Sequence, residues 1–143
     1  MVTSTISPAD VLRRYRVIAV VGASRDGSKD AHTVPRYMKE HGYQVVPVNP
    51  SAEEVLGERA YPSLLDLPPD IASKVEVVEV FRPSEELAEV AEQTVEMRRR
   101  SGTPYVFWAQ QGLESDEAKA ILEGEKIPYV MDACMRTVHR FMG

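Results

Sequence analysis

Residues 17–27 (VIAVVGASRDG) join an uninterrupted apolar run to a glycine-containing turn. Apolar runs without polar alternation are typical of parallel strands that are covered on both faces. Gly22 can adopt backbone angles that are closed to other residues, and we expect a helix to begin near Asp30 or Ala31. Because the N–H groups at a helix start attract anions, the segment predicts a strand–turn–helix unit with a site for a phosphate-bearing ligand, such as a nucleotide.

The turn departs from the dinucleotide fingerprint G-x-G-x-x-G. Gly22 and Gly27 hold its first and last positions, whereas Ser24 takes the middle one. The Ser24 hydroxyl can donate to a phosphate, but its Cβ limits how closely a pyrophosphate approaches the backbone. Ordinary NAD sites also place an acidic residue about 20 residues on, where this chain has Asn49-Pro50. The residues therefore disfavour NAD, although an NAD(P)-dependent reductase stays open as an alternative.

The composition is that of one globular domain, and we expect a single domain over residues 1–143. The hydrophobic fraction is 43%, the charged fraction is 27% and the net charge is −5. A negative net charge argues against nucleic acid or an anionic membrane surface as partner, and no apolar run approaches the roughly 18 residues of a membrane span. The single cysteine excludes an internal disulfide and fits a cytoplasmic location. The three histidines are too far apart in sequence to predict a metal site.

Apolar runs alternate with helical patterns along the whole chain. Ser7 and Ser84 are expected to cap helices, and Gly42 to follow the end of one. Glu76 and Glu79 lie within the third apolar run, which predicts that one face of this strand is less buried. The alternation predicts an α/β fold, Rossmann-like and doubly wound, with a parallel five-stranded sheet in three αβα layers. The expected strands are residues 16–21, 44–48, 75–81, 103–108 and 127–131; the expected helices are residues 7–14, about 31–41, 84–100, 115–123 and 135–141.

Ligands of such sheets bind beyond the carboxyl ends of the strands. Small residues and a helix start suit phosphate there, cations balance its charge, and an aromatic ring offers an apolar wall. Trp108 is expected to pack in the core, and Cys134 to be a small buried residue rather than a reactive thiol. Arg82 is expected to contact the ligand, to be an exposed charge or to be an ion-pair partner. We find no nucleophile–base pair and assign no catalytic residue. The candidate ligand contacts are Gly22, Ala23, Ser24, Arg25, Lys29, Asn49, Pro50, Phe81, Arg82 and Gln110.

Six short motifs at these strand ends resemble those of the small stand-alone CoA-binding proteins, which share a fold with the nucleotide domain of succinyl-CoA synthetase α subunits. The resemblance implies that coenzyme A lies across the strand ends. It further implies that the turn at residues 22–25 meets phosphates, while residues 49–50 and 81–82 line the nucleotide end. The motifs are VGAS at 21–24, GYQVVPVNP at 42–50, GERAYPSL at 57–64, VFRPS at 80–84, WAQQG at 108–112 and VMDACM at 130–135.

A non-catalytic or regulatory module that binds coenzyme A or an acyl-CoA is the leading functional hypothesis. A CoA-dependent enzyme that acts with a partner chain, or an NAD(P)-dependent reductase, is the alternative. A third hypothesis is an interaction protein whose nucleotide pocket is vestigial. We expect a small-molecule ligand and neither nucleic acid nor membrane as partner; a protein partner or a homo-oligomer stays open.

Overall fold

Five apolar segments form the parallel strands of one sheet in the computed structural model, which describes residues 2–142. They are β2 (Val17–Val21), β3 (Gln44–Val48), β6 (Val77–Val80), β7 (Val106–Ala109) and β8 (Tyr129–Met131). The predicted five-stranded parallel sheet is confirmed, with one addition. A sixth strand, β1 (Thr3–Ser4), pairs antiparallel with β8 at the sheet edge. Two residues are too few for a periodic pattern, so the sequence did not reveal this strand.

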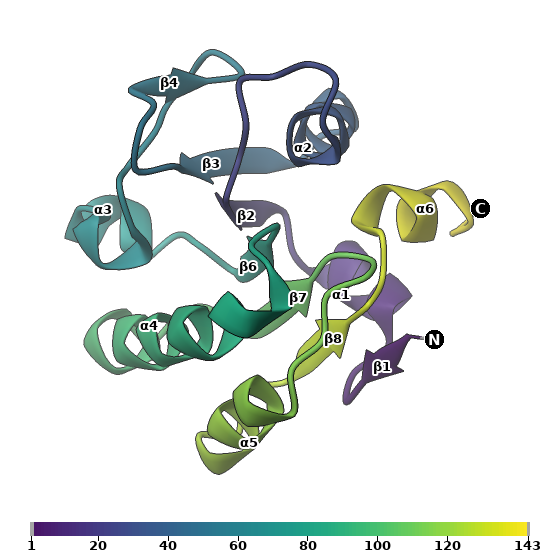
Figure 1. Ribbon diagram of the computed structural model, residues 1–143, viewed down its shortest axis with the longest axis vertical. Helices are drawn as coiled ribbons and strands as arrows, with labels where there is room; N and C mark the ends of the chain where they lie inside the picture. The colour runs from purple at the N-terminus through teal and green to yellow at the C-terminus, as the bar shows by residue number, and fades with distance from the viewer. Residues whose placement is uncertain (1, 143) are drawn as a thin grey trace.

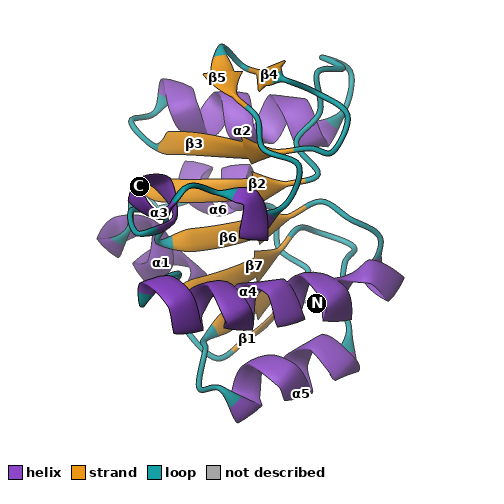
Figure 2. Cartoon of the chain, turned by 90° about the vertical axis from the view of Figure 1, so that its left-hand side faces the viewer, coloured by secondary structure: helices purple, strands orange, loops and turns teal. Residues whose placement is uncertain are grey.

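Helices cover both faces of the sheet, as expected for a Rossmann-like three-layer fold (Figure 1). One layer contains α1 (Pro8–Arg14), α2 (Asp30–Glu40) and α6 (Met135–Arg140). The other contains α3 (Pro69–Ala72), α4 (Leu87–Ser101) and α5 (Asp116–Gly124). Figure 2 shows α4 and α5 in front of the stacked strands and α2 behind them. Each layer packs its apolar side chains against the sheet in a separate core.

The strand order brings three strand ends together. The parallel strands run in the order β3-β2-β6-β7-β8, so β2 lies between β3 and β6. Val21, the last residue of β2, pairs with Val48 on one side and with Val80 on the other. The chain passes from β2 to β3 and then returns across β2 to β6, which makes β2/β6 the topological switch point where ligands bind in such sheets.

Helix capping follows the sequence at two of the three predicted positions. The Ser7 Oγ accepts from the Asp10 N–H at 3.4 Å, and Gly42 has φ +93° after the end of α2. Ser84 does not cap α4: it lies in a 3-10 turn, Ser84–Glu86, and its Oγ accepts from the Glu114 N–H at 3.1 Å. The Ser84 hydroxyl, which the sequence pattern assigned to the N-terminus of α4, is therefore engaged in a contact with a distant segment.

Three further short elements lie between β3 and α3. β4 (Glu54–Val55) and β5 (Glu58–Arg59) form a small antiparallel hairpin, and Leu64–Asp66 is a 3-10 turn. Tyr61 forms a bridge with Val48, which ties this segment to the carboxyl end of β3.

Glu79 contradicts the prediction that one face of β6 is less buried. All four β6 residues are buried, and Glu79 is 0% exposed because it lies under the layer of α1, α2 and α6, between Val20 and Trp108 on the neighbouring strands. Neither of its carboxyl oxygens has a hydrogen-bond partner within residues 2–142. Burial, and secondarily the charge of Cys134, raises the pKa of Glu79 to about 8.

We predict that this carboxyl makes the stability of the protein fall as the pH rises from about 4.5 to about 8. Because the folded pKa lies above the ordinary value of 4.5, the folded state binds more protons than the unfolded state in this range. Below about pH 4.5 the carboxyl is protonated in both states, and the folded state then does not bear the cost of a buried charge. The free energy of unfolding should decrease by roughly 1 kcal/mol per pH unit relative to Glu79→Gln. Urea unfolding across this range measures it, with exposed Glu89→Gln as the control; parallel curves for wild type and Glu79→Gln would contradict it.

Candidate functional site

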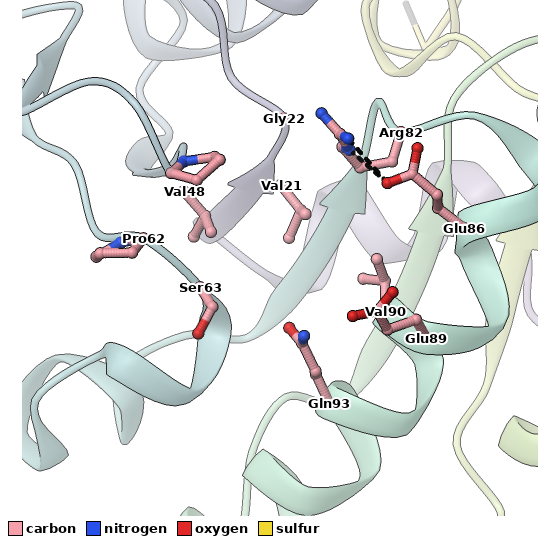
Figure 3. A pocket seen from close by; sticks show the side chains of 11 residues that line it. Val21, Gly22, Val48, Pro62, Ser63, Arg82, Glu86, Glu89, Val90 and Gln93 are labelled. Carbon is pink, nitrogen blue, oxygen red and sulfur yellow. Dashed lines mark hydrogen bonds and ion pairs between the residues drawn. The ribbon is translucent and has the colours of Figure 1, made fainter.

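A pocket of about 140 Å³ lies where β2, β3 and β6 end. Gly22, Pro50 and Arg82, which the sequence assigned to a ligand, come from three different strand ends and line it together. Figure 3 shows that Glu89, Val90 and Gln93 of α4 lie on the side of the pocket opposite Val48, Pro62 and Ser63. The lining residues are Val21, Gly22, Val48, Pro50, Pro62, Ser63, Arg82, Glu86, Glu89, Val90 and Gln93.

The turn after β2 needs glycine at its first position. Gly22 has φ +88°, in the left-handed region, and its N–H donates to the Val48 carbonyl at 2.9 Å. A Cβ at this position would lie 3.1 Å from the Arg82 Cδ and 3.4 Å from the Phe81 carbonyl carbon. The prediction that Gly22 adopts backbone angles closed to other residues is confirmed. A side chain is also excluded here because the residues that follow β6 approach Gly22 closely.

Asn49 joins the ends of β2 and β3. Its Nδ2 donates to the carbonyl of buried Ala23 at 2.8 Å, and its Oδ1 accepts from the N–H groups of Ser51 at 2.7 Å and Ala52 at 3.1 Å. These bonds give the Asn49 amide a structural role at the strand ends. The sequence predicted that Asn49 contacts the ligand, but its side chain is directed at the turn after β2.

The loop before α2 carries an anion of its own. The Asp26 carboxylate accepts from the Ser28 N–H at 2.9 Å and from the Ser28 hydroxyl at 2.6 Å, and these bonds hold its pKa below the ordinary value. The Ser24 Oγ in turn accepts from the Asp26 N–H at 3.0 Å. Arg25 and Lys29 are exposed beside this loop, and α2 begins after Lys29 without a side-chain cap.

Arg82 is both a pocket residue and an ion-pair partner. Its guanidinium contacts the Glu86 carboxylate at 2.8 Å, and the two side chains are 42% and 37% exposed (Figure 3). Exposed pairs of this kind contribute at most about 1 kcal/mol to stability. A ligand phosphate could therefore replace Glu86 as the partner of Arg82 at little cost.

Phe81 and Gln110 do not line the pocket. Phe81 is half-buried against the core beneath α2 and α6. Gln110 is 5% exposed, and its Oε1 accepts from the Met135 N–H at the start of α6 at 3.3 Å. Trp108 is fully buried, with its indole N–H donating to the Ala133 carbonyl at 2.8 Å. The packing role predicted for Trp108 is confirmed, whereas the structure gives Gln110 an interior position.

The sequence reasoning missed the wall that α4 and the Leu64–Asp66 turn provide. Ser63, Glu89 and Gln93 line the pocket, and none of them follows a parallel strand directly. Glu86, Val90 and Gln93 recur at helical spacing, which was the available signal for one shared face. We find no group of three or more His, Cys, Asp or Glu side chains suited to a metal ion within residues 2–142. Over the same residues, no helix is long and apolar enough to cross a membrane.

We predict that Gly22→Ala destabilises the protein by roughly 1–2 kcal/mol, since its φ is positive and the new Cβ meets Arg82 and the Phe81 backbone. Gly27→Ala is the matched control in the same loop, because its φ is not positive and the nearest atom to its Cβ is His32 Cδ2 at 4.0 Å. Urea unfolding of both variants measures the difference. Equal stabilities would show that the turn tolerates a side chain.

Comparison with known proteins identifies relatives along nearly the whole chain. The family model described as CoA binding domain matches residues 16–140. The uncharacterized protein YneT of Bacillus subtilis is 39% identical over 130 residues, which cover 91% of this chain and 90% of the relative. The α subunit of the ADP-forming acetate–CoA ligase II of Pyrococcus furiosus is 42% identical over 64 residues. That match covers 44% of this chain and 14% of the subunit.

Solved structures with the same fold also match nearly the whole chain. A hypothetical protein from Pyrococcus horikoshii OT3 superposes with a TM-score of 0.84 at 37% identity, covering 97% of this chain and 94% of the other. The Thermus thermophilus protein called cell-free ID.343 has a TM-score of 0.80 at 36% identity, covering 94% and 98%. With its Rossmann-like sheet and a family match that spans residues 16–140, the chain belongs to the CoA-binding domain family.

Proposed function

We propose that the protein binds coenzyme A, free or as an acyl-CoA, across the carboxyl ends of β2, β3 and β6. One observation carries the proposal: the family match over residues 16–140 coincides with a pocket built from all three of these strand ends. A ligand placed there would lie at the topological switch point, as nucleotides do in open parallel sheets.

The charges suggest which part of the ligand lies where. Arg25, Lys29 and the start of α2 surround the turn after β2 and would meet phosphates. Phosphate there would compete with the Asp26 carboxylate for the Ser28 N–H. Because the protein has a net charge of −5, these local cations matter more than long-range attraction.

The wall formed by α4 suits an uncharged part of the ligand. Glu86 and Glu89 would repel a phosphate, but their carboxylates, together with Ser63 and Gln93, can bond to hydroxyl or amide groups. Valine side chains at the ends of β2 and β3 and on α4 supply an apolar floor. A pocket of this composition fits the adenosine or the pantetheine portion of coenzyme A.

We propose a binding or regulatory role for this site rather than catalysis in it, and assign it no catalytic residue. The match to 14% of a ligase α subunit supports a second candidate. In it, the chain would be the CoA-binding component of an enzyme completed by a partner chain. An NAD(P)-dependent reductase has less support, because Asn49 offers no carboxylate to a ribose and its amide is engaged with Ala23.

Isothermal titration of nucleotide-free protein with CoA, acetyl-CoA, NAD and NADP tests the ligand. We expect saturable binding of the CoA compounds and none of NAD or NADP. The ratio of the CoA and acetyl-CoA affinities reports whether the thiol end is recognised. Preference for NAD or NADP would overturn the proposal in favour of the reductase, and absence of all binding would overturn it in favour of a vestigial pocket.

Two substitutions test the site itself. Gly22→Asp should abolish CoA binding, since it places a carboxylate at the phosphate turn, and Arg82→Ala should weaken binding by roughly tenfold through loss of a charged hydrogen bond. Arg100→Ala is the matched control, because Arg100 also forms a 2.8 Å pair with a glutamate four residues away, Glu96. Unchanged CoA affinity in folded Gly22→Asp protein would show that the ligand binds elsewhere.

A further inference from the structure

A cluster of aromatic and basic side chains joins α6 to α2, away from the pocket. The Tyr37 hydroxyl of α2 lies 2.8 Å from the Nδ1 atom of His139 on α6. The ring of His41, the residue after α2, stacks on Tyr37 with the ring centres 3.9 Å apart, and it meets the His139 ring at an angle at 5.2 Å. Tyr43, directly before β3, meets His139 edge-on at 5.7 Å. His139 is therefore in contact with three other rings.

The cluster gathers positive charge without a paired carboxylate. The guanidinium carbon of Arg140 lies 5.2 Å from the centre of the Tyr37 ring, and that of Arg16 lies 4.9 Å from the centre of the Tyr43 ring. The two histidines add up to two further charges when they are protonated. Within residues 2–142, none of the four basic groups of the cluster takes part in an ion pair with a carboxylate. Each proton that the cluster takes up therefore adds to an unbalanced positive charge.

The neighbouring helices do not compensate this charge at His139. Burial lowers the pKa of His139 below its ordinary value of 6.5, and the charges of His41 and Arg16 lower it further. A helix C-terminus such as that of α6 favours a protonated histidine, but these three causes outweigh it. The other charged groups on the packed elements, none of which is a cause of this shift, are Asp10, Arg13 and Arg14 on α1, Asp30, Arg36, Lys39 and Glu40 on α2, and Arg136 and Arg140 on α6.

The docking of α6 depends on few contacts. Its six residues are fewer than the roughly 12 that an isolated helix needs, and Met135 is the only one of them that is fully buried. Two bonds from the end of β7 hold the segment at its start: the Met135 N–H donates to Gln110 Oε1 at 3.3 Å, and the Ala133 carbonyl accepts from the Trp108 indole at 2.8 Å. The other end of α6 is held by the contact of His139 with α2.

We propose that His139 is a pH-sensitive latch, which holds α6 against α2 when its ring is neutral and releases the helix when the ring is protonated. In the neutral form the Tyr37 hydroxyl donates to Nδ1. Protonation places a hydrogen on Nδ1, so that two donors face each other, and it adds a charge beside Arg16 and His41. The latch is a property of the fold and does not depend on the identity of the ligand.

The direction of the effect follows from proton linkage. The pKa of His139 is lower in the docked state than its ordinary value of 6.5, so the docked state binds fewer protons than the released state around this pH. The docking of α6 is therefore strongest above about pH 6.5 and weakens as the pH falls through the lowered pKa. Glu79 acts with the opposite sign on the stability of the whole protein, because its folded pKa is raised. A local measurement on α6 separates the two effects.

Amide hydrogen exchange followed by NMR tests the latch between about pH 7.5 and pH 5.5, a range that brackets the ordinary pKa of histidine. The reporter is the Val138 N–H of α6, which donates to the Cys134 carbonyl at 3.0 Å. Its protection, relative to the intrinsic exchange rate at each pH, should fall as the pH decreases, by at most roughly tenfold per pH unit for one bound proton. Amides of α4 should keep their protection. Constant protection of α6, or an equal loss in α4, would overturn the latch.

Three substitutions assign the effect to His139. His139→Gln keeps an acceptor for the Tyr37 hydroxyl but cannot be protonated, so the pH dependence of α6 protection should disappear. His32→Gln is the matched control, because His32 also bonds through Nδ1, to the Ser24 carbonyl at 2.7 Å, but at the opposite end of α2; it should leave the dependence unchanged. If His139→Gln does not fold, His41→Gln removes one neighbouring charge and should make the dependence weaker. A dependence equal to that of the wild type in folded His139→Gln or His41→Gln protein would overturn the latch.

Discussion

Two hydrogen bonds between the ends of β2 and β3 organise the ligand edge of this protein. The Gly22 N–H donates to the Val48 carbonyl, and the Asn49 Nδ2 donates to the Ala23 carbonyl. Together they fix the turn after β2 against the next strand, so that Gly22 approaches Arg82 closely enough to exclude a side chain. The pocket exists because three strand ends meet in this arrangement. Without the amide of Asn49 the two turns would lose their direct side-chain link.

Charges of both signs lie around this edge. The segment from Arg25 to Asp30 holds two cations and two carboxylates, of which Asp26 is already bonded to Ser28. On the other side of the pocket, Glu86 is paired with Arg82 and Glu89 follows on α4. An anionic ligand would therefore depend on the positions of single cations and backbone N–H groups rather than on the net charge of −5.

The sequence predicted the features that depend on neighbouring residues, and it did not predict the contacts between distant segments. The apolar run of β2 and the positive φ of Gly22 follow from short-range chemistry, and both were predictable. Asn49 and Gln110 were recognised as polar residues at strand ends. Their bonds to Ala23 and to Met135 join segments about 25 residues apart, and no local pattern encodes them. Glu79 was misjudged for the same reason: only the packing of a helical layer over β6 shows that a charged residue type is fully buried.

The sheet separates the pocket from Glu79 and Cys134. Val21 and Val48 face the core beneath α3, α4 and α5, whereas Glu79 and Cys134 lie on the side of α1, α2 and α6. A ligand that contacts the pocket and also reaches Cys134 must cross the sheet edge. At that edge, beyond the end of β2, the backbone of Gly22 is packed against Arg82 and Phe81, so a ligand that crosses there must pass over these side chains. Binding in the pocket alone therefore requires no contact with Glu79 or Cys134.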